Sequence, residues 1–217
     1  MKFKRSVLLL ALVMTLVAAR AQVFSSNGVG YINVTLAPGY NFVANPLLAQ
    51  DNSIGELFAN IQGGVPDGLT VYKLVNGNFV IASYFEMTGT FEPADAAAEI
   101  TLPGDGVWVY LPSPSDRVLT FVGEIPQGDL CTDIPQGFSI KSNLIPKVDT
   151  IHDLNIPHSP NDVAYVWNRT SRDFSVYQFD NLDIDTSPTL QVAEAFYLYH
   201  TGPPTTWCRT FFLNNPQ

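Results

Sequence analysis

The chain has 217 residues, of which 46% are hydrophobic and 14% charged, and its formal net charge is −9. Four of its eleven basic residues lie within residues 1–21, so the rest of the chain sets seven positive charges against twenty negative ones. This composition excludes a disordered chain or a coiled coil. The acidic balance argues against nucleic acid or an anionic membrane surface as the main partner, because both favour a basic footprint.

Residues 1–21 are predicted to be a secretory signal peptide. Met1–Arg5 is basic, Val7–Ala19 is largely apolar, and Ala19-Arg20-Ala21 places small residues before a cleavage site at Gln22. The apolar stretch is shorter than the roughly 20 residues that a membrane-spanning helix needs. We therefore expect a secreted, periplasmic or cell-surface protein with no transmembrane helix in the mature chain.

The remaining sequence predicts a mainly β fold, built from two pseudo-repeats of a small β-sandwich or barrel-like module. Short β-branched or aromatic runs alternate with Pro-Gly, Asn-Gly and Pro-Ser dipeptides, which mark turns. Asn76-Gly77 is the strongest hairpin signal, because a tight turn needs positive φ at both central residues. The strands predicted in the first half are Val34–Leu36, Tyr40–Ala44, Leu69–Leu74, Phe79–Tyr84, Val107–Leu111 and Val118–Val122.

One short helix is predicted in the first half. Asn52 or Ser53 can cap its N-terminus, and Glu56 lies in its first turn. The apolar residues that share one face of this helix are Ile54, Leu57, Phe58 and Ile61. Ile151–Leu154 is the expected shorter counterpart in the second half.

Residues 28–125 and 126–214 are predicted to be two copies of one module that pack together. Gly39–Val43 recurs as Gly137–Lys141 at an offset of 98. The offset falls to 90 near the C-terminus, which predicts shorter loops in the second copy. The other matched segments are Tyr72 with Tyr165, Asn78-Phe79 with Asp173-Phe174, Gly106–Tyr110 with Ala195–Tyr199, and Leu119–Val122 with Arg209–Phe212.

These motifs resemble a recurrent module of bacterial secreted and surface proteins. Residues 38–43 read Pro-Gly-Tyr-Asn-Phe-Val, a strand containing Tyr72 follows, and residues 102–109 read Leu-Pro-Gly-Asp-Gly-Val-Trp-Val. The consensus of the module is G-W/Y-N followed by hydrophobic residues, then a Tyr-containing strand, then P-G-x-G-aromatic-W-V. The resemblance implies an exported β-module without an established enzymatic role. In the second copy Ala193-Glu194-Ala195 replaces Gly104-Asp105-Gly106, which predicts a relaxed turn.

The two cysteines, Cys131 and Cys208, are predicted to form a disulfide within the second copy. An oxidising compartment favours the pair, and the first and last strands of a compact module commonly approach each other. A metal site is disfavoured, because the chain has no Cys-x-x-Cys motif and no nearby pair of histidines.

Catalytic patterns are weak in this sequence. The chain lacks the Gly-x-Ser-x-Gly elbow of a hydrolase triad, and we expect its three histidines, His152, His158 and His200, to be surface polar groups. A glycosidase needs two carboxyl groups about 5–9 Å apart across a cleft. The candidate carboxylates are spread through predicted loops, and they are Glu86, Glu92, Asp95, Glu99 and Glu194.

One polar segment has the character of a cation-binding loop. Asn181, Asp183 and Asp185 alternate in a way that can turn oxygens toward calcium. The full calcium-loop pattern requires Gly after Asp185 and a Glu seven residues later, where this chain has Thr186 and Val192. A solvated acidic loop is the alternative, and no other cofactor is predicted.

Aromatic side chains recur at matched positions in both copies. Strand alternation places Trp108 and Tyr110 on one face of their strand, and Tyr197 and Tyr199 on one face of theirs. An outward face could stack on sugar rings, whereas an inward face is core packing, which two copies of one fold would both need.

Three functional hypotheses follow from these observations. The first is an exported, non-enzymatic protein that acts by adhesion or builds an envelope or extracellular structure, with a glycan or another surface protein as partner. The second is a carbohydrate-binding module that uses Trp108, Tyr110, Tyr197 and Tyr199, with calcium as a possible aid. The third is a secreted hydrolase. Exposure of those four aromatics discriminates the first two, and a cleft with facing carboxylates would favour the third.

Overall fold

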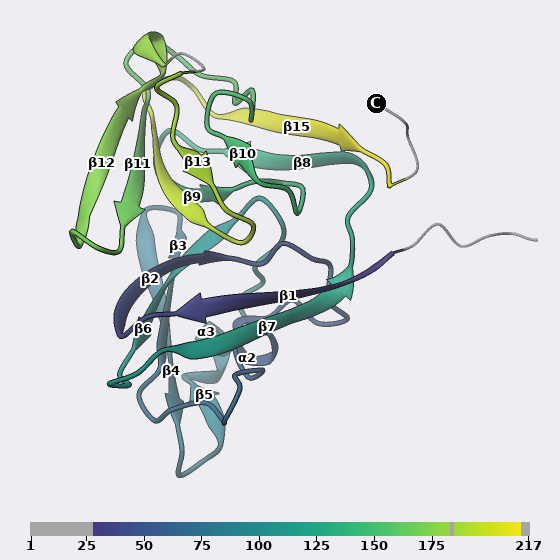
Figure 1. The fold of residues 1–217 in the computed structure, drawn as a ribbon, viewed down its shortest axis with the longest axis vertical. Coiled ribbons are helices and arrows are strands. Elements are labelled where there is room, and N and C mark those ends of the chain that lie inside the picture. The colour runs from purple at the N-terminus through teal and green to yellow at the C-terminus, as the bar shows by residue number, and fades with distance from the viewer. Residues whose placement is uncertain (1–27, 183–184, 214–217) are drawn as a thin grey trace, which may run out of the picture.

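The computed structural model describes residues 28–182 and 185–213. The predicted signal peptide, residues 1–21, lies outside these ranges. The chain folds into antiparallel sheets joined by short loops, with the first half and the second half stacked along the long axis of the molecule (Figure 1). The predicted mainly β fold class is confirmed.

The first half contains a five-stranded sheet and a two-stranded ribbon. The sheet has the order β2-β6-β3-β4-β5, and the ribbon pairs the first strand of this half with its last, β1 with β7. Each predicted strand overlaps an observed one, and Asn76 and Gly77 both have positive φ in the β3–β4 turn. The strands are β1 (Val29–Leu36), β2 (Gly39–Ala44), β3 (Thr70–Val75), β4 (Asn78–Phe85), β5 (Thr90–Glu92), β6 (Gly106–Leu111) and β7 (Arg117–Glu124).

Two short helices lie between the ribbon and the sheet of the first half. The helix α2 (Ile54–Leu57) is the predicted one, and it buries Ile54 and Leu57. The helix α3 (Ala94–Ala97) and the adjacent strand β5 were not predicted. The counterpart expected at residues 151–154 is wrong, because that segment forms turns rather than a helix.

The second half repeats the strand order of the first. Its main sheet runs β12-β11-β14-β9, where the first half has β4-β3-β6-β2, and its ribbon again pairs first strand with last, β8 with β15. A small pair, β10 with β13, and the short 3₁₀ helix η1 complete it. The bounds are β8 (Gly128–Ile134), β9 (Gly137–Ser142), β10 (Asp149–Thr150), β11 (Val163–Asn168), β12 (Asp173–Gln178), η1 (Phe179–Asn181), β13 (Thr189–Leu190), β14 (Ala195–His200) and β15 (Thr205–Phe211).

The strand registers give a residue-by-residue correspondence between the halves. Tyr72 lies opposite Trp108, and Tyr165 lies opposite Tyr197, as the sequence match requires. In the ribbons Asn33 lies opposite Thr120, and Cys131 lies opposite Cys208. If Asn33 corresponds to Cys131, the residue that corresponds to Cys208 is Thr120.

This register corrects part of the sequence alignment. The match of Leu119–Val122 with Arg209–Phe212 is shifted by two residues relative to the ladders. The corrected register places Leu119 with Trp207, and both side chains are fully buried. Superposition of the two halves as copies of one module stays a prediction.

Hydrophobic side chains form three separate clusters. The first fills the first half, between the β1–β7 ribbon and the five-stranded sheet. The second fills the second half around Trp207, whose indole N–H donates to the carbonyl of Leu154 at 3.1 Å. The third lies between the two main sheets and contains Phe42, Ala44, Ile140 and Ala195. The halves therefore share a junction core, which explains why no polar linker separates them.

Two backbone hydrogen bonds cross this junction in matched places. The amide of Ala44 donates to the carbonyl of Ala193 at 2.9 Å, and the amide of Ser142 donates to the carbonyl of Gly104 at 3.0 Å. Both accepting residues have left-handed backbones, with φ of 97° at Gly104 and 64° at Ala193. The prediction of a relaxed turn in the second half is therefore wrong, because the turn keeps the conformation that aims its carbonyl across the junction.

An ion pair and a close contact between the two main sheets at Gly106 complete the junction. Lys141, which is buried, donates to the carboxylate of Asp105 at 2.9 Å and to the hydroxyl of Thr132 at 2.9 Å. Gly106 has no room for a side chain, since a β-carbon there would lie 2.5 Å from the β-carbon of Ala195.

Candidate ligand-binding site at the junction of the two halves

The four aromatic residues singled out from the sequence divide into an inner and an outer pair. Trp108 and Tyr197 pack against the junction core, and the indole N–H of Trp108 donates to the Tyr197 hydroxyl at 2.8 Å. Burial raises the pKa of Tyr197, and the bond from Trp108 partly opposes that effect. Tyr110 and Tyr199 are each 37% exposed at the rim. Core packing therefore accounts for the inner pair, and the outer pair is accessible to a ligand.

The exposed tyrosine of the first half belongs to a larger aromatic face. Tyr40 is 51% exposed and lies directly opposite Tyr110 in the β2–β6 ladder, with ring centroids 5.1 Å apart. Tyr72 lies 6.2 Å from Tyr40, centroid to centroid. Burial raises the pKa of Tyr72, and the neighbouring Tyr40 and Tyr110 raise it further. We call Tyr40, Tyr72 and Tyr110 the tyrosine face.

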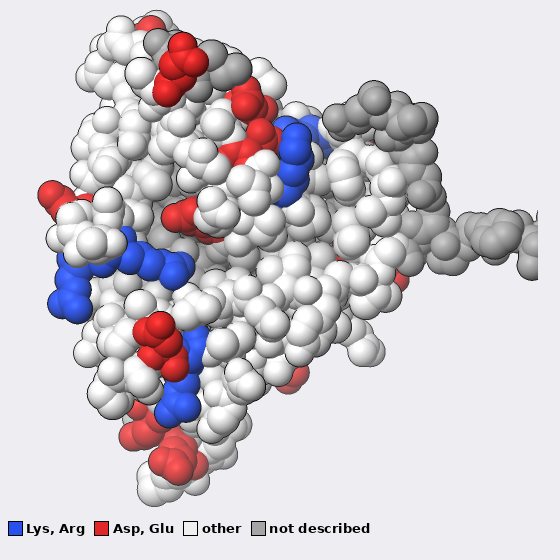
Figure 2. Space-filling view, in the orientation of Figure 1, with Lys and Arg blue, Asp and Glu red and all other residues white. Residues whose placement is uncertain are grey.

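A groove of about 780 Å³ begins at the tyrosine face and runs to the tip of the β11–β12 hairpin. The first half contributes Tyr40, Tyr110 and the segment 111–114, and the second half contributes Trp167, Arg169 and Arg172. Lys and Arg side chains gather where this hairpin meets the first half (Figure 2). We call this feature the junction groove, since neither half forms it alone.

Hydrogen bonds fix the backbone of the hairpin loop and the side chain of Arg169. The side-chain oxygen of Asn168 accepts the amides of Thr170 and Ser171 at 2.9 and 3.1 Å, which fixes the loop backbone. Arg169 donates to the carbonyl of Thr35 at 2.9 Å and so ties the loop to the end of β1. Arg172 has a positive φ of 55°. Both arginine side chains are exposed.

Trp167 lies between the junction core and the groove. Its ring centroid is 5.1 Å from that of Trp108, with the rings edge to face. Its indole N–H is covered and has no hydrogen-bond partner among the described residues. A buried donor without an acceptor costs about 1–3 kcal/mol.

A second groove, of about 510 Å³, occupies the corresponding place on the other side of the junction. It lies between the β3–β4 hairpin and the start of β9, where Phe138 stands in the position of Tyr40. The β3–β4 turn consists of Asn76 and Gly77, whereas the β11–β12 turn spans residues 169–172. The expectation of shorter loops in the second half is therefore wrong at this hairpin, and the added residues include both arginines.

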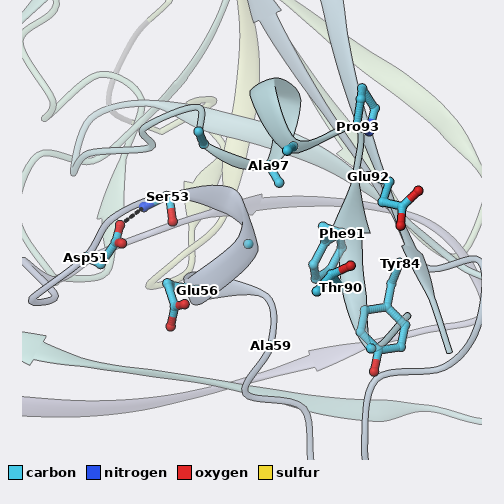
Figure 3. Close-up of a pocket in the computed structure, with 14 residues that line it drawn as sticks. Asp51, Ser53, Glu56, Ala59, Tyr84, Thr90, Phe91, Glu92, Pro93 and Ala97 are labelled. Atoms are coloured by element: carbon cyan, nitrogen blue, oxygen red, sulfur yellow. Dashed lines mark hydrogen bonds between the residues drawn. The ribbon is translucent and has the colours of Figure 1, made fainter. Parts of the chain in front are cut away.

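A third pocket, of about 690 Å³, lies between the two helices and β5 (Figure 3). Three carboxylate residues line it: Asp51, Glu56 and Glu92. Asp51 accepts the amide of Ser53 at 2.8 Å, and the carboxylates of Glu56 and Glu92 point in different directions rather than at a shared point (Figure 3). This geometry differs from the facing pair that glycoside hydrolysis uses.

The histidines differ from the sequence expectation at one position. His152 and His158 lie in loops, and the former contacts Asp153 at 3.0 Å. His200 was expected on the surface, which is wrong, because its side chain is 2% exposed. It stands in β14 where β6 has the buried Leu111, so strand alternation directs it into the core.

Asp162 and His200 form a buried polar pair. Oδ2 of Asp162 lies 2.6 Å from Nδ1 of His200, and Nε2 of the ring lies 2.9 Å from the carbonyl oxygen of Pro203. Asp162 also accepts the amides of Thr201 and Ser159, at 2.7 and 2.8 Å. Burial acts to raise the pKa of Asp162, but these hydrogen bonds outweigh it, and the pKa is lowered. The pair anchors the loop after β14 and lies apart from the junction groove.

The calcium candidate falls partly outside the described residues. Asp183 is not described, and the side-chain amide of Asn181 donates to Gln178 at 3.1 Å. Within residues 28–182 and 185–213, no group of three His, Cys, Asp or Glu residues is placed to hold a metal ion.

The predicted disulfide is confirmed. Cys131 and Cys208 are bonded and lie directly opposite each other in the β8–β15 ribbon, with a Cα–Cα distance of 4.1 Å. At the corresponding place in the first half, the Thr120 hydroxyl donates to the side chain of Asn33 at 2.8 Å. At corresponding positions, the ribbon of the second half is therefore linked by a disulfide and that of the first half by a side-chain hydrogen bond.

Comparison with known proteins adds no relative. No protein-family model, curated protein or solved structure matches the chain. Of the helices in the described part of the chain, none is long and apolar enough to cross a membrane. The resemblance to the bacterial secreted module stays a prediction.

Sequence reasoning missed several groove residues. Tyr40, Trp167, Arg169 and Arg172 were not proposed as site residues, because they come from opposite halves and meet only at the junction. A usable signal was present. Two of the few basic residues after position 21 are only three positions apart, between the segments matched to Tyr72 and to Asn78-Phe79.

Proposed function

We propose that this protein is an exported, non-catalytic adhesion module that attaches to glycans through the junction groove and the tyrosine face. The observation that carries the proposal is the groove itself. Exposed rings of Tyr40 and Tyr110 lie beside Trp167, and hydrogen-bonding groups stand at the other end. Sugars suit such a surface, because the C–H faces of a pyranose ring pack on aromatic rings while its hydroxyls need polar partners.

The proposal combines two of the hypotheses drawn from the sequence. From the first hypothesis it takes the role in adhesion, and from the second it takes carbohydrate as the ligand. The exposure of Tyr110 and Tyr199 supports the second hypothesis. Trp108 and Tyr197 pack against the junction core, so a sugar could stack only on the aromatic rings at the edges of the junction. The disulfide supports export, since such bonds persist in oxidising compartments.

The test is a glycan array probed with the purified, disulfide-bonded protein, with and without calcium. Glycans that bind are then titrated against Tyr110→Ala. We expect this variant to weaken binding roughly two- to tenfold, because a stacked aromatic ring contributes about 0.5–1.5 kcal/mol. The matched control is Tyr31→Ala, which removes a tyrosine that is 69% exposed on the β1–β7 ribbon, away from the groove.

Two results would contradict the proposal. One is an array on which no glycan binds in either calcium condition. The other is a glycan whose affinity falls equally with Tyr110→Ala and Tyr31→Ala, since the contact would then not be in the junction groove.

A further inference from the structure

The few basic side chains of this acidic protein are distributed unevenly. Outside residues 1–21 there are seven of them against twenty carboxylates. Lys73, Lys141 and Arg209 form salt bridges with carboxylates, at 3.2, 2.9 and 2.9 Å. Arg169 and Arg172 line the junction groove, and neither forms a salt bridge with a described carboxylate.

The second groove provides an internal comparison. It contains two cations as well, Lys73 and Lys141, but Glu99 and Asp105 neutralise them. Its hairpin turn, Asn76-Gly77, contributes no charge. Of these two related grooves, only the junction groove offers uncompensated positive charge beside exposed aromatic rings.

The guanidinium groups retain donors for a ligand. An arginine has five N–H donors arranged to bind a carboxylate through two parallel hydrogen bonds. Arg169 uses one of these donors on the carbonyl of Thr35. That bond fixes the position of the guanidinium while leaving its other donors available.

We propose that the junction groove selects acidic glycans, with the carboxylate of a uronic acid bound by Arg172 and Arg169 and the sugar ring packed on Tyr40 and Tyr110. This inference rests on the proposed glycan-binding function and names its substrate class. The net charge of the protein repels polyanions at long range, so attraction must come from contacts within the groove. Binding should therefore weaken as salt rises, because exposed charge pairs are screened.

The experiment compares two ligands with the same sugar backbone, one with charged carboxylates and one with neutral esters. The first is an oligogalacturonate of six residues, and the second is the same oligosaccharide with its carboxylates methyl-esterified. Each is titrated into the native protein, into Arg172→Gln, and into Lys147→Gln. Lys147 is exposed outside the groove, so its substitution removes the same charge without touching the site.

We expect the native protein to bind the acidic oligosaccharide at least tenfold more tightly than its ester, since hydrogen bonds to charged groups are the stronger ones. Arg172→Gln should lower the affinity for the acidic ligand about tenfold and leave that for the ester unchanged. Lys147→Gln should leave both affinities near the native values. Thermal unfolding of both variants checks that the fold is retained.

Other outcomes overturn the inference in distinguishable ways. Equal affinity for the acid and the ester, or equal losses in Arg172→Gln and Lys147→Gln, would refute acidic selectivity. If neither ligand binds while neutral glycans bind on the array in a Tyr110-dependent manner, the inference fails and the proposed function stands. If no glycan of either kind binds, both fail.

Discussion

Replacing Gly106 with alanine tests the contact between the two halves. A β-carbon at this position would lie 2.5 Å from the β-carbon of Ala195 and 2.7 Å from Cγ2 of Ile140. Carbon atoms pack at about 3.5–4 Å, so the two sheets would have to separate by roughly 1 Å at the junction. Overpacking of this kind costs about 1–3 kcal/mol.

The expected loss is measurable by thermal unfolding. For a protein of this size each kcal/mol corresponds to about 2–4 °C in melting temperature, so Gly106→Ala should melt about 2–12 °C below the native protein. The matched control is Gly55→Ala in α2, where the new β-carbon would lie 3.5 Å from the nearest atom, an ordinary contact. That variant should be neutral or slightly stabilised, because alanine favours a helix.

Equal melting temperatures for Gly106→Ala and the native protein would refute this reasoning. The two main sheets would then not approach each other as closely as the structure shows. A loss of similar size in Gly55→Ala would also count against it, since the cost would not be specific to the junction.

Two further predictions concern stability. Removing the disulfide with Cys131→Ser and Cys208→Ser should destabilise the second half by about 4.5 kcal/mol on the chain-entropy model, because the bond closes a sequence separation of 77. Equal denaturant midpoints for this variant and the native protein would contradict that expectation. Asp162, whose pKa is lowered, contributes stability that is complete above its ordinary pKa and is lost as pH falls through the folded-state value. Asp162→Asn should cost about 1.5–3 kcal/mol at pH 7, because buried donors lose hydrogen bonds to a charged acceptor, and should weaken the acid dependence of unfolding measured from pH 6 to 2. An unchanged acid dependence would show that other carboxylates control it.

The strands were predictable because local patterns determine them. In β6 the core-facing residues Val107 and Val109 alternate with Trp108 and Tyr110, and this alternation is visible in the sequence. The type of turn at Asn76-Gly77 was predictable for the same reason, since two adjacent residues that favour positive φ determine it. The strand β5 was missed, because three residues give too little periodicity to detect.

The sequence did not show which side chains on a strand face are covered by other parts of the chain. Periodicity places Trp108 and Tyr110 on the same side, but only the packing of the second half shows that Trp108 is covered and Tyr110 is not. The alternation of β14 also directs His200 inward, yet its partner Asp162 lies 38 positions away, so no local pattern indicated the pair. The junction groove was harder still to predict, because its residues come from both halves of the chain and lie far apart in the sequence.

The central claim is that a glycan binds in the junction groove, and a crystal structure of the protein with a bound oligosaccharide from the array tests it most directly. The account predicts a sugar ring packed on Tyr40 and Tyr110, with polar groups of the ligand within hydrogen-bonding distance of Arg169 or Arg172. A ligand seated instead in the pocket beside Glu56 and Glu92, or in the second groove with the junction groove empty, would contradict it.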